Sequence, residues 1–189
     1  MNPEVPGETL ASPHADDVTP SSIPDAIAVP QGNEVFLVGQ GSGTQNYICL
    51  PSATGFDWVL FTPQATLFND EDRQVVTHFF SPSPPDSDPT KPAPTWQAND
   101  NSTVWAAKDA SVPSPTGSID WLRLKTVATQ PGRTGGDRLS DTTYILRVNT
   151  KGGIKPGAPC TTASNVEGKN CVPYEAQYIF YRAVDGEDD

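Results

Sequence analysis

His78, in the segment VVTHFF, has the most versatile side chain for chemistry in this sequence. A neutral imidazole can bind a metal ion, and the same ring can accept or donate a proton near neutral pH. Zinc and copper sites need several converging ligands, and His14 is the only other histidine, so a three-histidine centre is excluded within one chain. No GxSxG segment supplies a nucleophilic serine. We therefore expect that the protein binds no metal and no cofactor and that His78 has a structural role. The alternative is a catalytic site, or a metal site of His78 with other ligand types.

Gly39, Gly41 and Gly43 follow a strand-like segment and resemble the start of a dinucleotide-binding loop. The full G-x-G-x-x-G fingerprint needs a glycine where Thr44 stands, and a helix must follow it. The next residues, TQNYICL, have the pattern of a strand, so no helix N-terminus is expected where pyrophosphate would bind. We predict a glycine-rich hairpin turn here and disfavour a nicotinamide-dependent dehydrogenase.

Aromatic residues and one arginine are the remaining candidates for a ligand site. Trp96 and Trp105 flank QANDNST, which we interpret as a hairpin connection. Exposed tryptophans or tyrosines could stack on sugar rings, whereas buried ones belong to a core, which is the more common case. Arg147 is an isolated cation in an apolar strand, so we expect it to pair with a carboxylate or to bind loop carbonyls. If a ligand site exists, we expect it to involve His78, Trp96, Tyr47 and Arg147; no residue is assigned as catalytic.

Carboxylates are numerous, and a pair at a set separation could hydrolyse glycosides. Most of them lie in segments typical of turns, where aspartate forms local hydrogen bonds, so we interpret them as solvated turn residues. The candidates are Asp57, Asp70, Glu71, Asp72, Asp100, Asp120, Asp137 and Asp141.

The three cysteines, Cys49, Cys160 and Cys171, match no zinc-binding spacing. A Cys49–Cys160 disulfide would tie a late loop to an early strand, and a Cys160–Cys171 disulfide would close a local loop. Either one would contribute about 3 kcal/mol to stability and would indicate an oxidising compartment. The alternative is three buried free thiols in a cytosolic protein. Asn101, in the tripeptide NST, is an acceptor for N-glycosylation in a secreted eukaryotic protein.

Alternation of apolar and polar residues sets the fold class. The pattern recurs along the chain and is clearest in TTYILRVNT and VPYEAQYIFYR, and this period of two predicts half-buried strands. We predict an all-β fold, an antiparallel β-sandwich or a barrel-like sheet of about eight to ten strands with long Pro-rich loops. The expected strands are 26–30 (an edge strand), 33–41, 44–51, 56–68, 73–81, 94–99, 102–110, 119–128, 142–150 and 174–182.

We expect one β domain over residues 23–183, between a flexible, acidic, Pro-rich tail at 1–22 and an acidic tail at 184–189. The Pro-rich insert at 81–94 is predicted to be an exposed loop, and TTASNVEGK (161–169) a single helical turn.

The amino-acid composition limits the classes of molecule that this protein can bind. The net charge is −11 and the sequence has no basic cluster, so nucleic acid and anionic membranes are poor partners, although the charge could attract a cationic ligand. No apolar run reaches the length of a membrane-spanning helix. The N-terminus lacks the basic and apolar segments of a signal peptide, which fits a mature or recombinant form of a secreted chain and, by this segment alone, equally fits an intracellular protein.

Several ordered motifs together resemble a family. GTQNYICLPSATGFDWVLFTPQATLF, VVTHFFS, PTWQANDNSTVWA, IDWLRLK, GGDRLSDTTYILRVNTKGG and VPYEAQYIFYR look like the uncharacterised secreted-protein family catalogued as domain of unknown function 3455, over residues 23–183. The resemblance implies a bacterial or fungal protein made behind a secretion signal, without an established biochemical role. Some fungal members carry a malate dehydrogenase label, against which the broken glycine pattern argues.

The resemblance also bears on individual residues. The family pattern has cysteines at the positions of Cys49 and Cys160, which favours that disulfide. The family places the histidine matching His78 almost next to the Pro-Thr-Trp run that ends at Trp96, whereas the insert separates them here. A site that uses both requires the insert to loop out and return.

These observations lead to two hypotheses. The first is an extracellular, disulfide-containing, acidic glycoprotein that acts as a binding or structural module, with a glycan or cell-wall component as its ligand and no inserted membrane segment. The second is a secreted enzyme or metal-binding protein with its site around His78.

Overall fold

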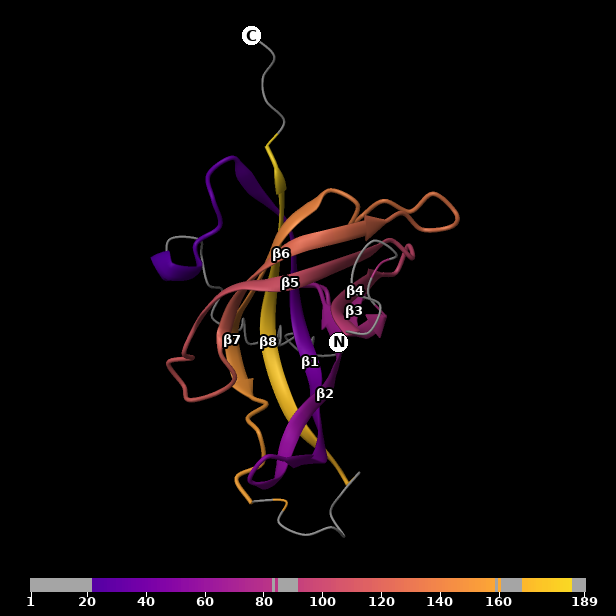
Figure 1. Cartoon of the computed structure of the whole chain (residues 1–189). Helices are drawn as coiled ribbons and strands as arrows, with labels where there is room; N and C mark the ends of the chain where they lie inside the picture. Colours follow the sequence, from indigo (N-terminus) through magenta and orange to yellow (C-terminus); the bar gives the residue numbers. More distant parts are fainter. Residues whose placement is uncertain (1–21, 83, 85–91, 159, 161–167, 185–189) are drawn as a thin grey trace, which may run out of the picture.

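The computed structural model describes residues 22–82, 84, 92–158, 160 and 168–184, and eight antiparallel strands account for most of them (Figure 1). The strands are β1 (Asn33–Ser52), β2 (Gly55–Phe68), β3 (Gln74–Pro82), β4 (Pro92–Ala98), β5 (Thr103–Val112), β6 (Trp121–Gln130), β7 (Thr142–Gly152) and β8 (Lys169–Ala183).

The eight strands form one closed barrel with up-and-down order. Each strand pairs with the next in the sequence, and β1 pairs with β8 to close the sheet. Closure leaves no unpaired edge, so every strand has a hydrogen-bonded neighbour on both sides. The prediction of an all-β, antiparallel, barrel-like fold is confirmed, with the barrel rather than the sandwich as its form.

The predicted glycine-rich hairpin turn is wrong, because β1 runs without a break through Gly39, Gly41 and Gly43. The three glycines occupy alternate positions that face the barrel interior. A Cβ atom on Gly41 would lie 2.8 Å from the Tyr178 ring, and one on Gly39 would lie 3.1 Å from Leu67. Gly39 and Gly41 therefore leave space for large side chains, and Gly43 allows the β2 backbone at Gln64 and Ala65 to approach closely. Segments 33–41 and 44–51 form one strand instead of two.

The predicted edge strand at 26–30 is also wrong. Its first residues belong to a short 3-10 helix, η2 (Asp25–Ile27), which packs on the outside of the barrel. Ile27 is fully buried there against an outer apolar cluster that includes Leu146 and Ile179. Because β1 and β8 already pair with each other, the closed sheet offers no edge to which this segment could add as a strand.

One end of the barrel is filled by side chains, and we call it the packed end. It holds the β2–β3, β4–β5 and β6–β7 connections, and Leu67, Val76, Ile145 and Phe180 pack together inside it. Leu139, from the β6–β7 connection, is fully buried in the same cluster, and its N–H donates to the Ser102 hydroxyl at 3.1 Å. These contacts close the interior to solvent at this end.

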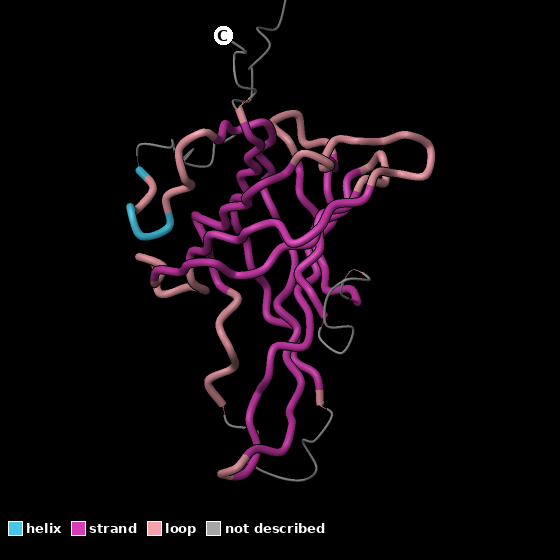
Figure 2. Tube along the Cα trace, turned by 45° about the horizontal axis from the view of Figure 1, so that its top comes forward, coloured by secondary structure: helices cyan, strands magenta, loops and turns pink. Residues whose placement is uncertain are grey.

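The opposite end, the open end, holds the β1–β2, β5–β6 and β7–β8 connections. The β1–β2 hairpin extends beyond the rest of the barrel, and the strands narrow toward it (Figures 1 and 2). A disulfide joins Cys49 of β1 to Cys160, which follows β7, and Cys171 is an exposed free thiol. The Cys49–Cys160 pairing is therefore confirmed over the local Cys160–Cys171 alternative.

Some predicted segments lie outside the described residues. These are the tails, apart from Ser22 and Val184, and the helical turn at 161–169, apart from Gly168 and Lys169, where β8 begins. The predicted loop at 81–94 also lies outside them at 83 and 85–91, and its two ends belong to β3 and β4 instead. Within the described part, no helix is long and apolar enough to cross a membrane.

Candidate ligand cavity in the open end of the barrel

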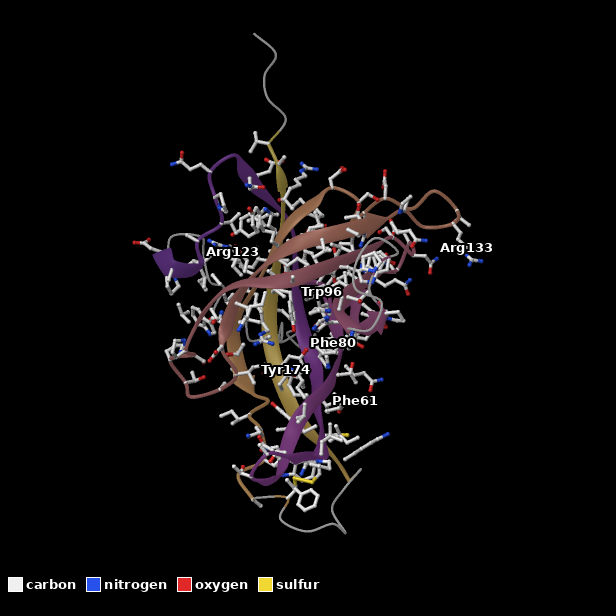
Figure 3. The ribbon with its side chains drawn as sticks, in the orientation of Figure 1. Phe61, Phe80, Trp96, Arg123, Arg133 and Tyr174 are labelled. Atoms are coloured by element: carbon white, nitrogen blue, oxygen red, sulfur yellow. A yellow bond between two sulfur atoms is a disulfide. The ribbon has the colours of Figure 1, made fainter. Side chains whose placement is uncertain are left out.

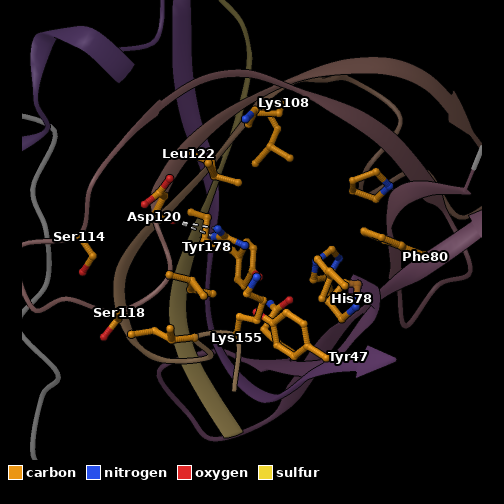
Figure 4. Close-up of a pocket in the computed structure, with 18 of the residues that line it drawn as sticks. Tyr47, His78, Phe80, Lys108, Ser114, Ser118, Asp120, Leu122, Lys155 and Tyr178 are labelled. Carbon is orange, nitrogen blue, oxygen red and sulfur yellow. Dashed lines mark hydrogen bonds between the residues drawn. The ribbon is translucent and has the colours of Figure 1, made fainter. Parts of the chain in front are cut away.

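A cavity of about 610 Å³ occupies the open end of the barrel (Figure 4). Inward side chains of β1 to β8 form its walls, and the β5–β6 and β7–β8 connections border its mouth. Protein sites for small molecules commonly enclose about 300–1,000 Å³. The cavity is therefore large enough for an organic molecule of one or two rings.

His78 and Trp96 form an aromatic wall of the cavity. They are direct partners across β3 and β4, and their rings stack with centroids 4.2 Å apart and an interplanar angle of 9°. The pairing continues to Pro82 and Pro92, so the chain leaves the sheet after β3 and returns in register at β4. The Pro-rich insert thus does not keep His78 and Trp96 apart.

The protonation state of His78 follows from its surroundings. The Thr95 carbonyl lies 2.9 Å from Nδ1 and can only accept, so Nδ1 carries the proton and Nε2 is left as an acceptor. Burial lowers the pKa of His78 to about 3, and the nearby charge of Arg147 acts in the same direction. His78 is therefore a neutral imidazole at physiological pH and a weak base.

Arg147 lies in the cavity wall and is held by the chain before β6. Its Nε and Nη2 atoms donate to the carbonyl of Asp120 at 3.2 and 2.9 Å, and its positive charge acts against the rise that burial causes in the pKa of the nearby Tyr178 phenol. The expected contact with a loop carbonyl is therefore present. Among the described residues no carboxylate forms an ion pair with Arg147. A guanidinium has five N–H donors, so three of them remain after these two bonds.

Three tyrosines support this side of the cavity. The hydroxyls of Tyr174 and Tyr178 are 3.0 Å apart, and the Tyr47 hydroxyl donates to the Gly153 carbonyl at 2.7 Å. Burial raises the pKa of all three phenols, against the opposing effect of the Arg147 charge. They are therefore neutral hydroxyl groups at neutral pH, and Tyr47 ties β1 to the chain at the mouth of the cavity.

The chain after β7 forms part of the mouth and is tied to the β1–β2 hairpin. Lys155 pairs with Asp57 at 2.8 Å, the Trp58 indole donates to the Ala158 carbonyl at 3.0 Å, and the disulfide follows at Cys160. Ile154, with 51% of its surface exposed, lines the cavity beside Leu60, which is 39% exposed. The mouth thus carries apolar groups that an entering ligand would contact.

The charges of the lining are mostly positive. Lys108, Arg147 and Lys155 line the cavity together with one carboxylate, Asp120 (Figure 4). This balance is opposite to the net charge of −11 of the whole chain. Two further donors, Gln45 Nε2 and Trp96 Nε1, are buried without an acceptor among the described residues, and both side chains line the cavity.

The structure brings together all four residues predicted for a ligand site, since His78, Trp96, Tyr47 and Arg147 line this one cavity. Trp105 instead donates its indole N–H to Ser81 at 2.8 Å and does not line it. Figure 3 places Trp96 and Phe80 toward the middle of the barrel, and Arg123 and Arg133 at its margins.

Sequence reasoning missed several lining residues, above all Gln45, Lys108, Lys155 and Tyr178. Gln45 and Tyr178 share strand faces with Tyr47 and Tyr174, so the period-two pattern contains a signal for them. Lys155 follows β7 and carries no such signal.

The carboxylates do not form a metal or hydrolytic centre in the part of the chain that is described. No group of three histidine, cysteine, aspartate or glutamate side chains there could hold a metal ion. Asp100 accepts hydrogen bonds from Ser102 and from the N–H of Arg138, which fits the predicted role of a turn residue. These bonds hold the pKa of Asp100 below its usual range against the opposing effect of burial.

A closed eight-stranded antiparallel barrel with a ligand-sized cavity in one end defines the structural class of this protein. Residues 30–182 match the family model described as "Protein of unknown function (DUF3455)", so the chain belongs to that family, as the resemblance of its motifs implied. Comparisons with curated proteins and with solved structures gave no match.

Proposed function

We propose that this protein binds a small organic molecule in the open end of its barrel. The observation that carries the proposal is the cavity of about 610 Å³, which combines the stacked His78–Trp96 wall with hydrogen-bond donors such as Arg147. Apolar walls with a few converging polar groups are typical of small-molecule sites. This is the binding hypothesis of the sequence, now assigned to an interior cavity rather than to an exposed surface.

A glycan or cell-wall ligand is constrained by the same geometry. Trp96 is only 1% exposed and His78 covers one face of its ring, so Trp96 is no open platform for a polysaccharide chain. A carbohydrate ligand would have to insert a terminal sugar unit into the cavity.

Binding is better supported than catalysis. A general acid or base works best with a pKa near the operating pH. The pKa of His78 is lowered to about 3 and the pKa values of the lining tyrosines are raised, so these groups exchange protons poorly at neutral pH.

Extracellular location is part of the proposal. Disulfides persist mainly in oxidising compartments, and the Cys49–Cys160 bond fits such a setting. Asn101 lies exposed in the β4–β5 turn, where an N-linked glycan could attach without displacing a buried side chain. Intact mass of the secreted chain, with and without glycosidase treatment, tests both points.

A neutral fluorescent probe, N-phenyl-1-naphthylamine, tests the binding function. We expect saturable binding with one site per chain. Leu122→Trp, which adds bulk to the cavity wall, should weaken it about tenfold or more. Val127→Trp on the same strand is the matched control, because Val127 is 51% exposed and lies outside the cavity. Absence of saturable binding, or equal binding by Leu122→Trp and the wild type, would overturn the proposal.

A further inference from the structure

Arg147 has a free side in the cavity. Its guanidinium is oriented by the Asp120 carbonyl, which is a neutral acceptor. Three of its N–H groups remain, and the described residues provide no carboxylate for them. A guanidinium in this state is ready to form a bidentate pair with a planar anion.

The Asp120 carbonyl holds Arg147 in a fixed direction, because it accepts hydrogen bonds from both Nε and Nη2. Tyr178, which lines the same cavity, is fully buried, and its hydroxyl lies 3.0 Å from that of the buried Tyr174. Because the side chain is oriented before a ligand arrives, little conformational entropy would be lost on binding.

The rest of the lining favours an anion with an apolar body. Lys108 is a second cation of the cavity without an ion-pair partner in the described part of the chain, and Lys155 lies at the mouth. Phe80, Leu122 and Leu124 are apolar side chains of the same lining. Lys155 is neutralised by Asp57, so Arg147 and Lys108 are the cations that can attract an anion, against the single lining carboxylate Asp120.

We propose that the cavity is selective for small carboxylic acids with a flat apolar body, and that Arg147 binds the carboxylate. This inference rests on the proposed binding function and adds the ligand class and the residue that recognises it. The carboxylate would accept two of the three remaining N–H groups of Arg147, and the apolar body would lie against the partly exposed Phe80 and Leu122 side chains of the same cavity. A charge-assisted bidentate pair of this kind discriminates strongly against a neutral amide of the same shape.

The pair 2-naphthoate and 2-naphthamide tests the ligand class, because the two molecules share shape and differ in charge. We expect wild-type protein, by isothermal titration calorimetry, to bind 2-naphthoate about tenfold or more tighter than 2-naphthamide. Affinity for 2-naphthoate should fall as salt is raised, since part of the attraction is between charges. 2-Naphthalenesulfonate tests whether the site recognises the planar geometry of a carboxylate or only its negative charge. We expect it to bind more weakly than 2-naphthoate.

Arg147→Gln tests the residue. It should lower affinity for 2-naphthoate about tenfold or more and change affinity for 2-naphthamide by less than about twofold. Arg147→Lys, which keeps the charge but not the planar fork, should be intermediate. Arg182→Gln is the matched control, because Arg182 pairs with Glu34 away from the cavity and should leave both affinities unchanged.

The outcomes separate the two proposals. Binding of N-phenyl-1-naphthylamine that Leu122→Trp weakens, together with equal wild-type affinity for the acid and the amide, would overturn the carboxylate inference and leave the binding function standing. Failure of all these probes would overturn both. The wild-type comparison needs no variant, so the inference stays testable if Arg147→Gln does not fold.

Discussion

The two ends of the barrel interior are built from the same strands but differ in what their inward side chains do. In β3, Val76 packs at one end, and two residues further along His78 lines the cavity. In β7, Ile145 is followed in the same way by Arg147. The backbone ladder is continuous across this change. Stability and recognition are thus divided along each strand, with apolar contacts concentrated at the packed end and polar groups at the open end.

Among the substitutions considered, Phe180→Ala should lower the stability of the protein most. The side chain is fully buried at the packed end, so its removal leaves a cavity and should lower the free energy of unfolding by about 3–5 kcal/mol. Urea denaturation measures the change. Phe61→Ala, at a residue that is 54% exposed, is the control and should cost much less. Equal losses for the two variants would show that the packed end is not where stability is concentrated.

Removal of the disulfide comes next. Cys49→Ser or Cys160→Ser should lower the free energy of unfolding by about 2–4 kcal/mol, because the bond closes a long loop across the open end. Cys171→Ser should have no measurable effect, since this thiol is exposed and unpaired. Denaturation of the oxidised proteins in parallel gives the difference. A loss that Cys171→Ser reproduces would contradict this view of the open end.

His78 should make stability depend on pH. Its pKa in the folded protein is about 3, below the ordinary 6.5, so the unfolded chain binds the proton more readily between these values. Stability is therefore full above pH 6.5 and falls with decreasing pH, by about 2 kcal/mol between pH 6.5 and 5. Above pH 5 the carboxylates contribute little to this change.

Denaturation of the wild type and of His78→Gln across this range isolates the contribution of His78. The variant should show a flatter dependence on pH, whatever its stability at pH 7. Parallel pH profiles for the two proteins would mean that His78 is not buried as a neutral ring.

Arg147→Gln should have the smallest effect on stability, a change within about 1 kcal/mol, because the side chain is only partly buried and its hydrogen-bond partner is neutral. The same variant is expected to lose most of its affinity for 2-naphthoate. A loss of stability as large as that of Phe180→Ala would show that Arg147 holds the open end together, and the division between the two ends would fail.

The strands could be predicted from the sequence because the alternation of apolar and polar residues is a local pattern. The pattern located the strands, but it split β1 at its glycines, because a glycine facing a crowded interior looks the same as a glycine in a turn. Residues 26–30 looked like a strand for a related reason. Whether an apolar segment pairs with a sheet or packs over it depends on closure of the sheet elsewhere in the chain.

The candidate site was predictable in part. His78, Trp96, Tyr47 and Arg147 were selected for their chemistry, and the register of β3 with β4 brings the first two into contact. The cavity that these residues line could not be predicted, because its volume depends on how all the inward side chains pack together. The charge of the lining could not be predicted either. A net charge of −11 suggested attraction of a cation, but a total over the chain does not say which side chains face one cavity.

The stem of the β3–β4 hairpin makes the segment between Pro82 and Pro92 suited to protein engineering. The register is already set by the pairs from His78 and Trp96 outward to Ser81 and Ala93. The number of residues inserted beyond the stem should therefore matter little to the geometry of the aromatic wall. Phe80 and Pro94 of this stem line the cavity, so a peptide tag or a fluorescent reporter joined to the stem would suit a sensor that responds when a molecule enters.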